Sequence, residues 1–195
     1  GEGHCLAFYA YKDIEKLEKF MSGKPLAEQE VGFALLHEMV AYAETSMSRR
    51  KFILHYFGEE YDEINGAGVE MDDNARNPKP KVEAQNEAVL LLSLVRETNQ
   101  QYKIKELIHI MVGEETPILV SHRISATPIF GQGSANKKEF WKALLTQLLV
   151  AGYLTKEIET YGIIKLSEKG VKFLENPVSY LMTENHVYDA LTVAP

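Results

Sequence analysis

Residues 131–170 read GQGSANKKEFWKALLTQLLVAGYLTKEIETYGIIKLSEKG, and they predict a helix, a strand, a tight turn, a strand and a second helix. The apolar residues at helical spacing are Phe140, Trp141, Leu144, Leu145, Leu148 and Leu149, and the polar face holds Lys138, Lys142 and Thr146. We therefore expect one side of this long helix in the core and the other against solvent or a partner. Asn136 with Glu139 fits an N-cap pair, and Gly152 fits the helix stop.

The residues after the long helix predict a hairpin. Two short apolar runs, 153–158 and 163–166, are separated by a turn whose Tyr-Gly pair at 161–162 suits a tight connection. Ser167 is expected to cap one more short helix. This order matches the second half of a winged helix, in which the hairpin is the wing and the long helix faces DNA.

Composition limits the class of protein. With 195 residues and 45% hydrophobic content the chain can bury a substantial core. The single cysteine, Cys5, cannot form an internal disulfide, and no run of about twenty apolar residues could span a membrane. We expect a cytoplasmic monomer without a membrane partner. Because the chain lacks an initiator methionine and begins at Gly1-Glu2-Gly3, we expect a fragment of a longer protein.

The net charge of -7 is unevenly distributed along the chain. Residues 1–80 hold 9 basic and 15 acidic side chains, whereas residues 81–195 hold 12 and 13. From Thr116 to Lys138 there is no acidic residue, only Arg123, Lys137 and Lys138. This stretch predicts a local basic surface on an acidic protein.

The rest of the chain predicts further helices, and the whole is expected to be mainly α with a minor β component (α+β). The helices are expected from Asp13 to Gly23, Leu26 to Thr45, Arg49 to Gly58, Val82 to Thr98 and Ile104 to Gly113, with an apolar row of Val31, Leu35, Met39 and Tyr42 in the second. Residues 59–80 and 116–134 predict irregular loops. The expected parts are 1–10, the last strand of a preceding domain; 11–80, a helical hairpin platform; 81–176, the winged-helix domain; and 177–195, a linker or tail.

Two segments together resemble the RecQ family of DNA helicases. Residues 48–59 read SRRKFILHYFGE and residues 71–78 read MDDNARNP, which are similar to the helix and the zinc loop in that family's C-terminal region. Phe130-Gly131-Gln132-Gly133, Trp141 and Gly152-Tyr153-Leu154 resemble its winged helix, and the first three residues resemble the end of its motor domain. The resemblance covers about residues 1–176.

The zinc loop departs from this resemblance. The family's four cysteine positions correspond to Ser48, Val69, Asp72 and Ala75, none of which is a thiolate, so we expect zinc to be absent. Asp72 and Asp73 could hold Mg²⁺ or Ca²⁺, but two carboxylates in a loop are usually only solvated. We expect apolar packing beneath the helical hairpin to replace the zinc.

The candidate DNA contacts are basic and polar residues near the long helix. They are Arg123, Ser134, Lys137, Lys138, His122 and Tyr161. The lysines beside a helix start could bind phosphates, although an ordinary exposed helix start would look the same. Tyr161 at the wing tip could stack on a base or simply pack on its own domain. Phe140 and Trp141 are expected in the core.

The resemblance implies the C-terminal region of an ATP-dependent 3′–5′ DNA helicase of replication, recombination and repair. This region is expected to bind double-stranded DNA and duplex/single-strand junctions, with ATP and Mg²⁺ used by a motor domain outside it. The fragment contains no Gly-Lys-Ser/Thr phosphate loop and is expected to be inactive as an enzyme. The alternatives are a winged-helix transcription regulator and a protein-interaction module. The preferred DNA structure, strand separation by the wing, and whatever follows Pro195 are left open by the sequence.

Overall fold

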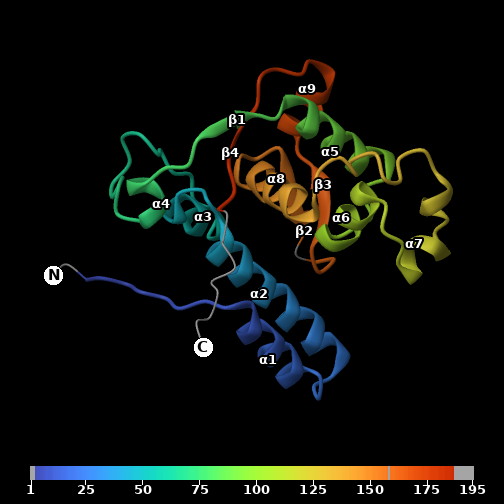
Figure 1. Cartoon of the computed structure of the whole chain (residues 1–195), viewed down its shortest axis with the longest axis horizontal. Helices are drawn as coiled ribbons and strands as arrows, with labels where there is room; N and C mark the ends of the chain where they lie inside the picture. The colour runs from blue at the N-terminus through green and yellow to red at the C-terminus, as the bar shows by residue number, and fades with distance from the viewer. Residues whose placement is uncertain (1–2, 158, 187–195) are drawn as a thin grey trace, which may run out of the picture. The chain divides into compact units, whose positions relative to one another are not determined.

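The computed structural model describes residues 3–157 and 159–186, which form two compact units, Gly1–Glu44 and Thr45–Pro195 (Figure 1). The expected α+β fold, with helices, a hairpin and no large sheet, is confirmed. In the described part of the chain, no helix has the length and apolar character needed to cross a bilayer.

The first unit is a helical hairpin of α1 (Tyr11–Met21) and α2 (Leu26–Glu44), close to the predicted bounds. The strand expected over residues 4–10, as the last strand of a preceding domain, is not formed here, since residues 3–10 have no regular secondary structure. A strand needs a neighbour that supplies hydrogen bonds, and no described segment pairs with this one. Three residues of the apolar row predicted in the second helix, Val31, Leu35 and Met39, are exposed.

The second unit contains the remaining elements, with a short 3₁₀ turn. They are α3 (Arg49–Tyr56), α4 (Asp73–Arg76), β1 (Lys81–Glu83), α5 (Gln85–Glu97), α6 (Ile104–Val112), α7 (Pro117–Ser121), η1 (Ile124–Ala126), α8 (Lys138–Val150), β2 (Leu154–Glu157), β3 (Ile163–Leu166), α9 (Glu168–Glu175) and β4 (Leu181–Thr183). The short helices α4, α7 and η1 lie in stretches that the sequence predicted to be irregular. Each is only three to five residues long, too short for a periodic apolar pattern.

Helix α8 lies at the centre of this unit, with α5, α6 and the β2–β3 hairpin around it (Figure 1). Trp141, Leu144, Leu145 and Leu148 are at most 1% exposed, as their spacing predicted. In the middle of α5, Leu91, Leu92, Leu94 and Val95 are equally buried, with Leu91 and Leu92 completely enclosed. Burial of this apolar surface is the main force that holds the unit together.

The N-cap expected at Asn136 is wrong. Helix α8 begins at Lys138, with Lys137 as an N-cap that makes no side-chain hydrogen bond. The preceding loop is held instead by the end of α6, where the amides of Gly131 and Gly133 donate to carbonyls at 2.7 and 2.8 Å. These tertiary bonds set where α8 begins, and side-chain capping signals cannot reveal them.

The hairpin after α8 is antiparallel, with Leu154 opposite Leu166 and Glu157 opposite Ile163. Its turn places Tyr161 and Gly162 at positive φ, 56° and 102°. The predicted strand end at Ile158 lies outside the described residues. The hairpin is fixed to the beginning of α6, because the amide of Ile164 donates to the carbonyl of Tyr102 at 3.0 Å.

The tail predicted as a linker contains β4, which pairs antiparallel with β1. Val82 and Met182 face each other in this pair, and Met182 is buried. The side chain of Gln147 in α8 donates to the carbonyl and accepts from the amide of Thr183, both at 2.8 Å. The expected domain end at residue 176 is therefore too early, since residues 181–183 complete the unit.

Gly170 in α9 allows that helix to approach the chain at Tyr153. A Cβ atom at this position would lie 2.1 Å from the carbonyl oxygen of Tyr153, which is backbone and cannot rotate away. We expect Gly170→Ala to destabilise the unit by about 1–3 kcal/mol in urea unfolding. Gly23→Ala is the control, since open space surrounds Gly23. Equal stability of the two variants would contradict this close packing.

Candidate nucleic-acid interface

The structure separates the six candidate residues into two groups at opposite ends of α6. Tyr161, His122 and Arg123 belong to the end where α6 begins, and Ser134, Lys137 and Lys138 belong to the end where it stops. The helix has nine residues, so the two ends lie about 14 Å apart. A contact surface that includes all six residues must therefore run along α6.

The group at the beginning of α6, which we call the wing-side group, consists of Tyr161, Lys103, His122 and Arg123. Tyr161 is 46% exposed, and the amine of Lys103 lies 5.9 Å from the centre of its ring. His122 follows α7, and its Nδ1 lies 2.7 Å from the hydroxyl of Tyr102. Arg123 is exposed and has left-handed backbone geometry, with φ of 58°.

The buried Tyr102 determines how His122 presents its ring. Burial, with a smaller effect from Glu106, raises the pKa of the Tyr102 hydroxyl, so the hydroxyl stays protonated. In the tautomer of His122 whose Nδ1 accepts from this hydroxyl, the other ring nitrogen carries the hydrogen. That N–H can donate to an acceptor such as a phosphate oxygen.

The group at the end of α6, which we call the helix-start group, consists of Ser134, Lys137 and Lys138. Ser134 and Lys137 are exposed, whereas Lys138 forms an ion pair with Glu114. The same Glu114 oxygen lies 3.4 Å from Nε2 of His109. The hydrogen bond from Lys138 lowers the pKa of Glu114, so this carboxylate keeps its negative charge in mildly acidic solution.

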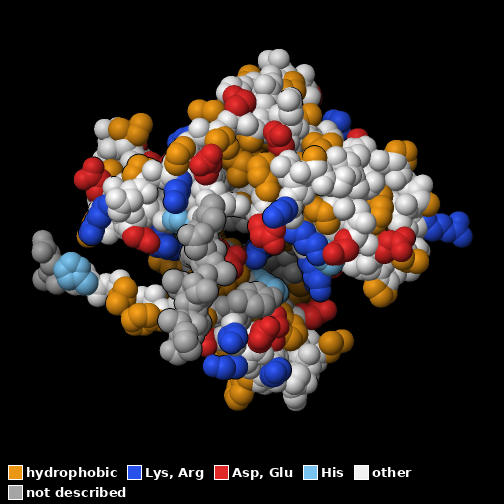
Figure 2. Space-filling model, viewed as in Figure 1, with side chains coloured by type: hydrophobic (Ala, Val, Ile, Leu, Met, Phe, Trp, Pro, Cys, Tyr) orange, Lys and Arg blue, Asp and Glu red, His pale blue; other side chains and the backbone are white. Residues whose placement is uncertain are grey.

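The basic stretch predicted from the sequence is therefore not free of acid in space. No acidic residue occurs from Thr116 to Lys138, but the turn after α6 brings Glu114 to the beginning of α8. Figure 2 also shows acidic and basic side chains intermingled on the visible face, without one large basic patch. The expected basic surface is thus reduced to separate cations among carboxylates.

Most of α8 cannot face a ligand. Gln147 is buried in addition to most of the predicted core positions, and the polar positions Lys142 and Thr146 are half-buried. Contacts with β4 and α3 cover part of the side of α8 that the sequence predicted to face solvent or a partner. Glu139, in the first turn, is the exposed residue of the helix.

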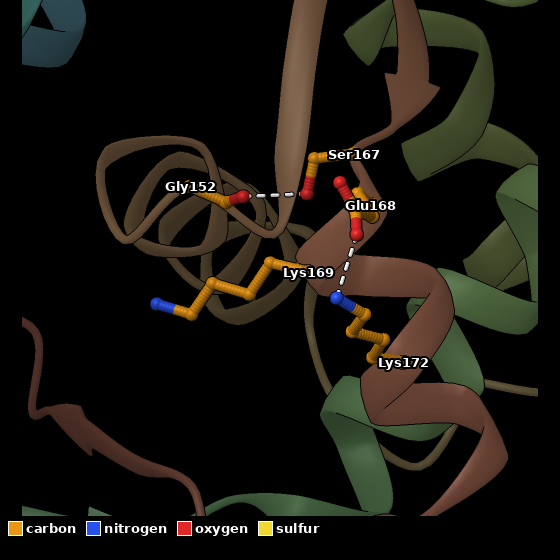
Figure 3. A pocket seen from close by; sticks show the side chains of 5 residues that line it. All are labelled: Gly152, Ser167, Glu168, Lys169 and Lys172. Atoms are coloured by element: carbon orange, nitrogen blue, oxygen red, sulfur yellow. Dashed lines mark hydrogen bonds and ion pairs between the residues drawn. The ribbon is translucent and has the colours of Figure 1, made fainter.

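An open pocket lies beside the beginning of α9, lined by Gly152, Ser167, Glu168, Lys169 and Lys172 (Figure 3). Each of its charged side chains already interacts with another group of the protein. Lys172 pairs with Glu168 at 2.6 Å, and Lys169 donates to the carbonyl of Ala151 at 2.7 Å while lying over the ring of Tyr153. The predicted cap is confirmed, since Ser167 accepts from the amide of Gly170. The pocket offers no unengaged cation to a phosphate.

Sequence reasoning missed Lys103 and Glu114. Lys103 lies in the short connection between α5 and α6, which carries no recognisable motif. It meets Tyr161 only because the β2–β3 hairpin packs against this connection. Glu114 follows the glycine that ends α6, and that position could have suggested a chain reversal toward α8. For metal ions, the described residues contain no group of three or more His, Cys, Asp or Glu side chains that could form a site.

Comparison with known proteins gives two family matches. Residues 78–190 match the RQC domain, and residues 11–67 match the RecQ zinc-binding family. The first match covers more than half of the chain.

Individual relatives are similar over most of the chain. A protein of Acanthamoeba polyphaga mimivirus, provisionally named an ATP-dependent RNA helicase, is 28% identical over 89% of this chain and 34% of its own length. The ATP-dependent DNA helicase RecQ of Pasteurella multocida is 24% identical over 91% of this chain and 28% of its own length. An ATP-dependent DNA helicase of Schizosaccharomyces pombe is 25% identical over 80% of this chain and 12% of its own length. The chain thus spans about a third or less of these relatives.

Proposed function

The chain belongs to the RecQ family as a C-terminal region with an RQC domain, and we propose that it is the duplex-DNA-binding region of a RecQ-like ATP-dependent 3′–5′ DNA helicase. The whole protein would act in DNA replication, recombination and repair. In this proposal ATP and Mg²⁺ are used by a motor domain outside these residues. The region itself binds double-stranded DNA and its junctions with single strands, and it hydrolyses nothing alone.

The observation that carries the proposal is the docking of the β2–β3 hairpin on the beginning of α6. This docking places the exposed ring of Tyr161 beside Lys103, next to the segment that bears His122 and Arg123. An aromatic ring beside a cation suits the end of a duplex, because cations bind phosphates of any sequence and a ring can stack on an exposed base. Lys137 and Ser134 would add phosphate contacts at the other end of α6.

The two rival functions make different demands on binding. A transcription regulator reads base edges and prefers one sequence, whereas phosphate contacts are independent of sequence. A protein-interaction module would bind duplexes weakly or not at all. The RNA helicase name of the mimivirus relative also makes duplex RNA a necessary comparison.

The test is a salt series of binding isotherms with two unrelated DNA duplexes, a duplex with a 3′ overhang and an RNA duplex. We expect similar affinity for the two DNA duplexes, tighter binding of the overhang substrate, and a slope of log affinity against log salt of about -3 for three phosphate contacts. A strong preference for one DNA sequence would favour the regulator. Tighter binding of the RNA duplex would make RNA the substrate. If none of the four nucleic acids binds, the protein-interaction module is the remaining function.

Glu114 competes with phosphate for Lys138 in this proposal. We expect Glu114→Gln to strengthen duplex binding about threefold to fivefold at low salt, because Lys138 would no longer be shared with a carboxylate. Fluorescence anisotropy at low and moderate salt measures the change, which should shrink as salt rises.

Glu115→Gln is the matched control, since it removes the same charge one residue later. Glu115 is exposed, and no described residue forms an ion pair with it. Equal strengthening by both variants would mean that only net charge matters. Unchanged binding by Glu114→Gln would place Lys138 outside the interface.

A further inference from the structure

The segment that matches a zinc-binding family lacks the chemistry for zinc. Residues 11–67 contain no cysteine, and the chain's single cysteine, Cys5, is exposed in the first unit. Of the four positions compared with zinc ligands, Val69 and Ala75 have no side-chain donor atom. A structural zinc site needs four Cys or His ligands at tetrahedral positions, so these residues do not fit the metal.

We propose that a hydrogen-bonded cluster of Ser48, Asp72 and Asn74, which we call the polar clamp, holds the α3–α4 region together in place of zinc. A structural zinc ion joins segments that are distant in sequence at one point. The polar clamp does the same with neutral and charged hydrogen bonds. This inference concerns folding and does not depend on the proposed DNA binding.

The first part of the polar clamp is a carboxylate shared by two helix starts. Ser48 is the N-cap of α3, and its hydroxyl donates to Oδ2 of Asp72 at 2.9 Å. Asp72 is the N-cap of α4, where its Oδ1 accepts from the amide of Ala75 at 2.9 Å. Oδ2 also accepts from the amide of Arg50 in the first turn of α3, at 3.4 Å. One side chain therefore satisfies backbone amides of both helices.

The charge of Asp72 is maintained by these bonds. Burial alone would raise the pKa of this carboxyl, but the hydrogen bonds from Ala75, Ser48 and the α3 amides together lower it below its usual value. Beside it, Nε of the Arg49 guanidinium donates to Oδ1 of Asp73 at 2.6 Å. This contact adds an exposed ion pair between the same two helices. The α3 and α4 starts are thus linked by charge-assisted hydrogen bonds.

The second part of the polar clamp is the side-chain amide of Asn74, which is only 4% exposed. Its Nδ2 donates to the carbonyls of Thr45 and Met47, both at 2.8 Å. Its Oδ1 lies 2.9 Å from Nε2 of His186, so this nitrogen must carry the hydrogen. Asn74 therefore ties together the segment before α3, helix α4 and the segment after β4, and its partner His186 is 112 residues away in sequence.

Apolar packing, expected from the sequence to replace the metal, does not hold the loop between α3 and α4. Ile64 and Met71 in this loop are 82% and 66% exposed. At the loop's end the buried side chain is instead that of Asn74, whose Nδ2 and Oδ1 both make hydrogen bonds. Their removal would leave buried carbonyls without donors, which is costly in a protein interior.

Two measurements on the full chain test the polar clamp. The protein, purified without a metal-affinity tag, should contain far less than one equivalent of zinc by elemental analysis, and its Tm should not change with EDTA. Asn74→Ala should lower the Tm by about 6 °C or more. Asn77→Ala, the same change at an exposed asparagine three residues later, should shift it by no more than about 1 °C.

If Asn74→Ala is too unstable to purify, Asp72→Asn takes its place, with a smaller expected decrease of about 2–4 °C because asparagine still caps α4. Stoichiometric zinc, or a Tm that falls with EDTA, would overturn the proposal. A Tm of the clamp variant equal to that of Asn77→Ala would overturn it as well.

Discussion

Replacing Trp141 with alanine is expected to lower the free energy of unfolding of the second unit by about 3–5 kcal/mol. The ring is 1% exposed, and its Nε1 donates to the carbonyl of Gly133 at 2.8 Å. Gly133 lies directly against the ring, since a Cβ there would come within 2.6 Å of it. The loop before α8 would therefore lose both its packing partner and its hydrogen bond. Urea unfolding followed by circular dichroism measures the loss.

Two variants separate packing from hydrogen bonding in this prediction. Trp141→Phe keeps most of the ring volume but loses the donor, so its cost should be smaller than that of Trp141→Ala. Phe140→Ala removes the neighbouring ring, which is only partly buried and meets Trp141 edge to face at 5.2 Å. It should also cost less. A stable Trp141→Ala with impaired DNA binding would show that the ring faces the ligand instead of the core.

Reversing both charges at Lys137 and Lys138 to glutamate is expected to weaken duplex DNA binding roughly 10- to 100-fold at moderate salt, whatever the sequence. Loss of two phosphate contacts should also flatten the slope of log affinity against log salt by about 1.8. The fold should tolerate the change, because both positions lie at the N-terminal end of α8, where acidic side chains are favourable. Binding isotherms on two unrelated duplexes in a salt series measure both effects.

The matched control reverses Lys16 and Lys19 in α1, two exposed lysines of the first unit. The net charge changes by the same amount in both variants, so general repulsion of DNA is equal. We expect the control to bind nearly as the parent does. If the control loses binding while the Lys137 and Lys138 variant keeps it, the DNA surface lies on the helical hairpin.

The sequence predicted best those elements that are long and packed on one side. The apolar spacing in α8 gave its buried face, and the glycines at 113 and 152 marked the helix ends correctly. The β1–β4 pair was missed because each strand has three residues and its partner lies about a hundred positions away. Pairings of this kind depend on the completed core and leave no local periodicity.

The candidate site was harder to predict because charges along the chain and charges in space differ. The stretch from Thr116 to Lys138 contains no acidic residue in sequence, yet in the structure Lys138 forms an ion pair with Glu114. Tyr161 and His122, two of the candidate DNA contacts, are exposed in the structure, whereas Lys103 meets Tyr161 only through tertiary packing. Which of these residues contact DNA is a prediction that the binding experiments decide.

The β1–β4 pair has a mechanical consequence for the second unit. Lys81 lies opposite Thr183, so the chain enters β1 and leaves β4 at the same end of the pair. Tension applied through the two flanking segments would therefore open the ladder like a zipper, one hydrogen bond after another, instead of shearing all of them together. The bonds of His186 with Asn74 and of Glu184 with Pro80 would yield first, and those of Gln147 with Thr183 would follow. Under such tension the second unit would therefore lose its last strand first, while the core around α8 stays folded.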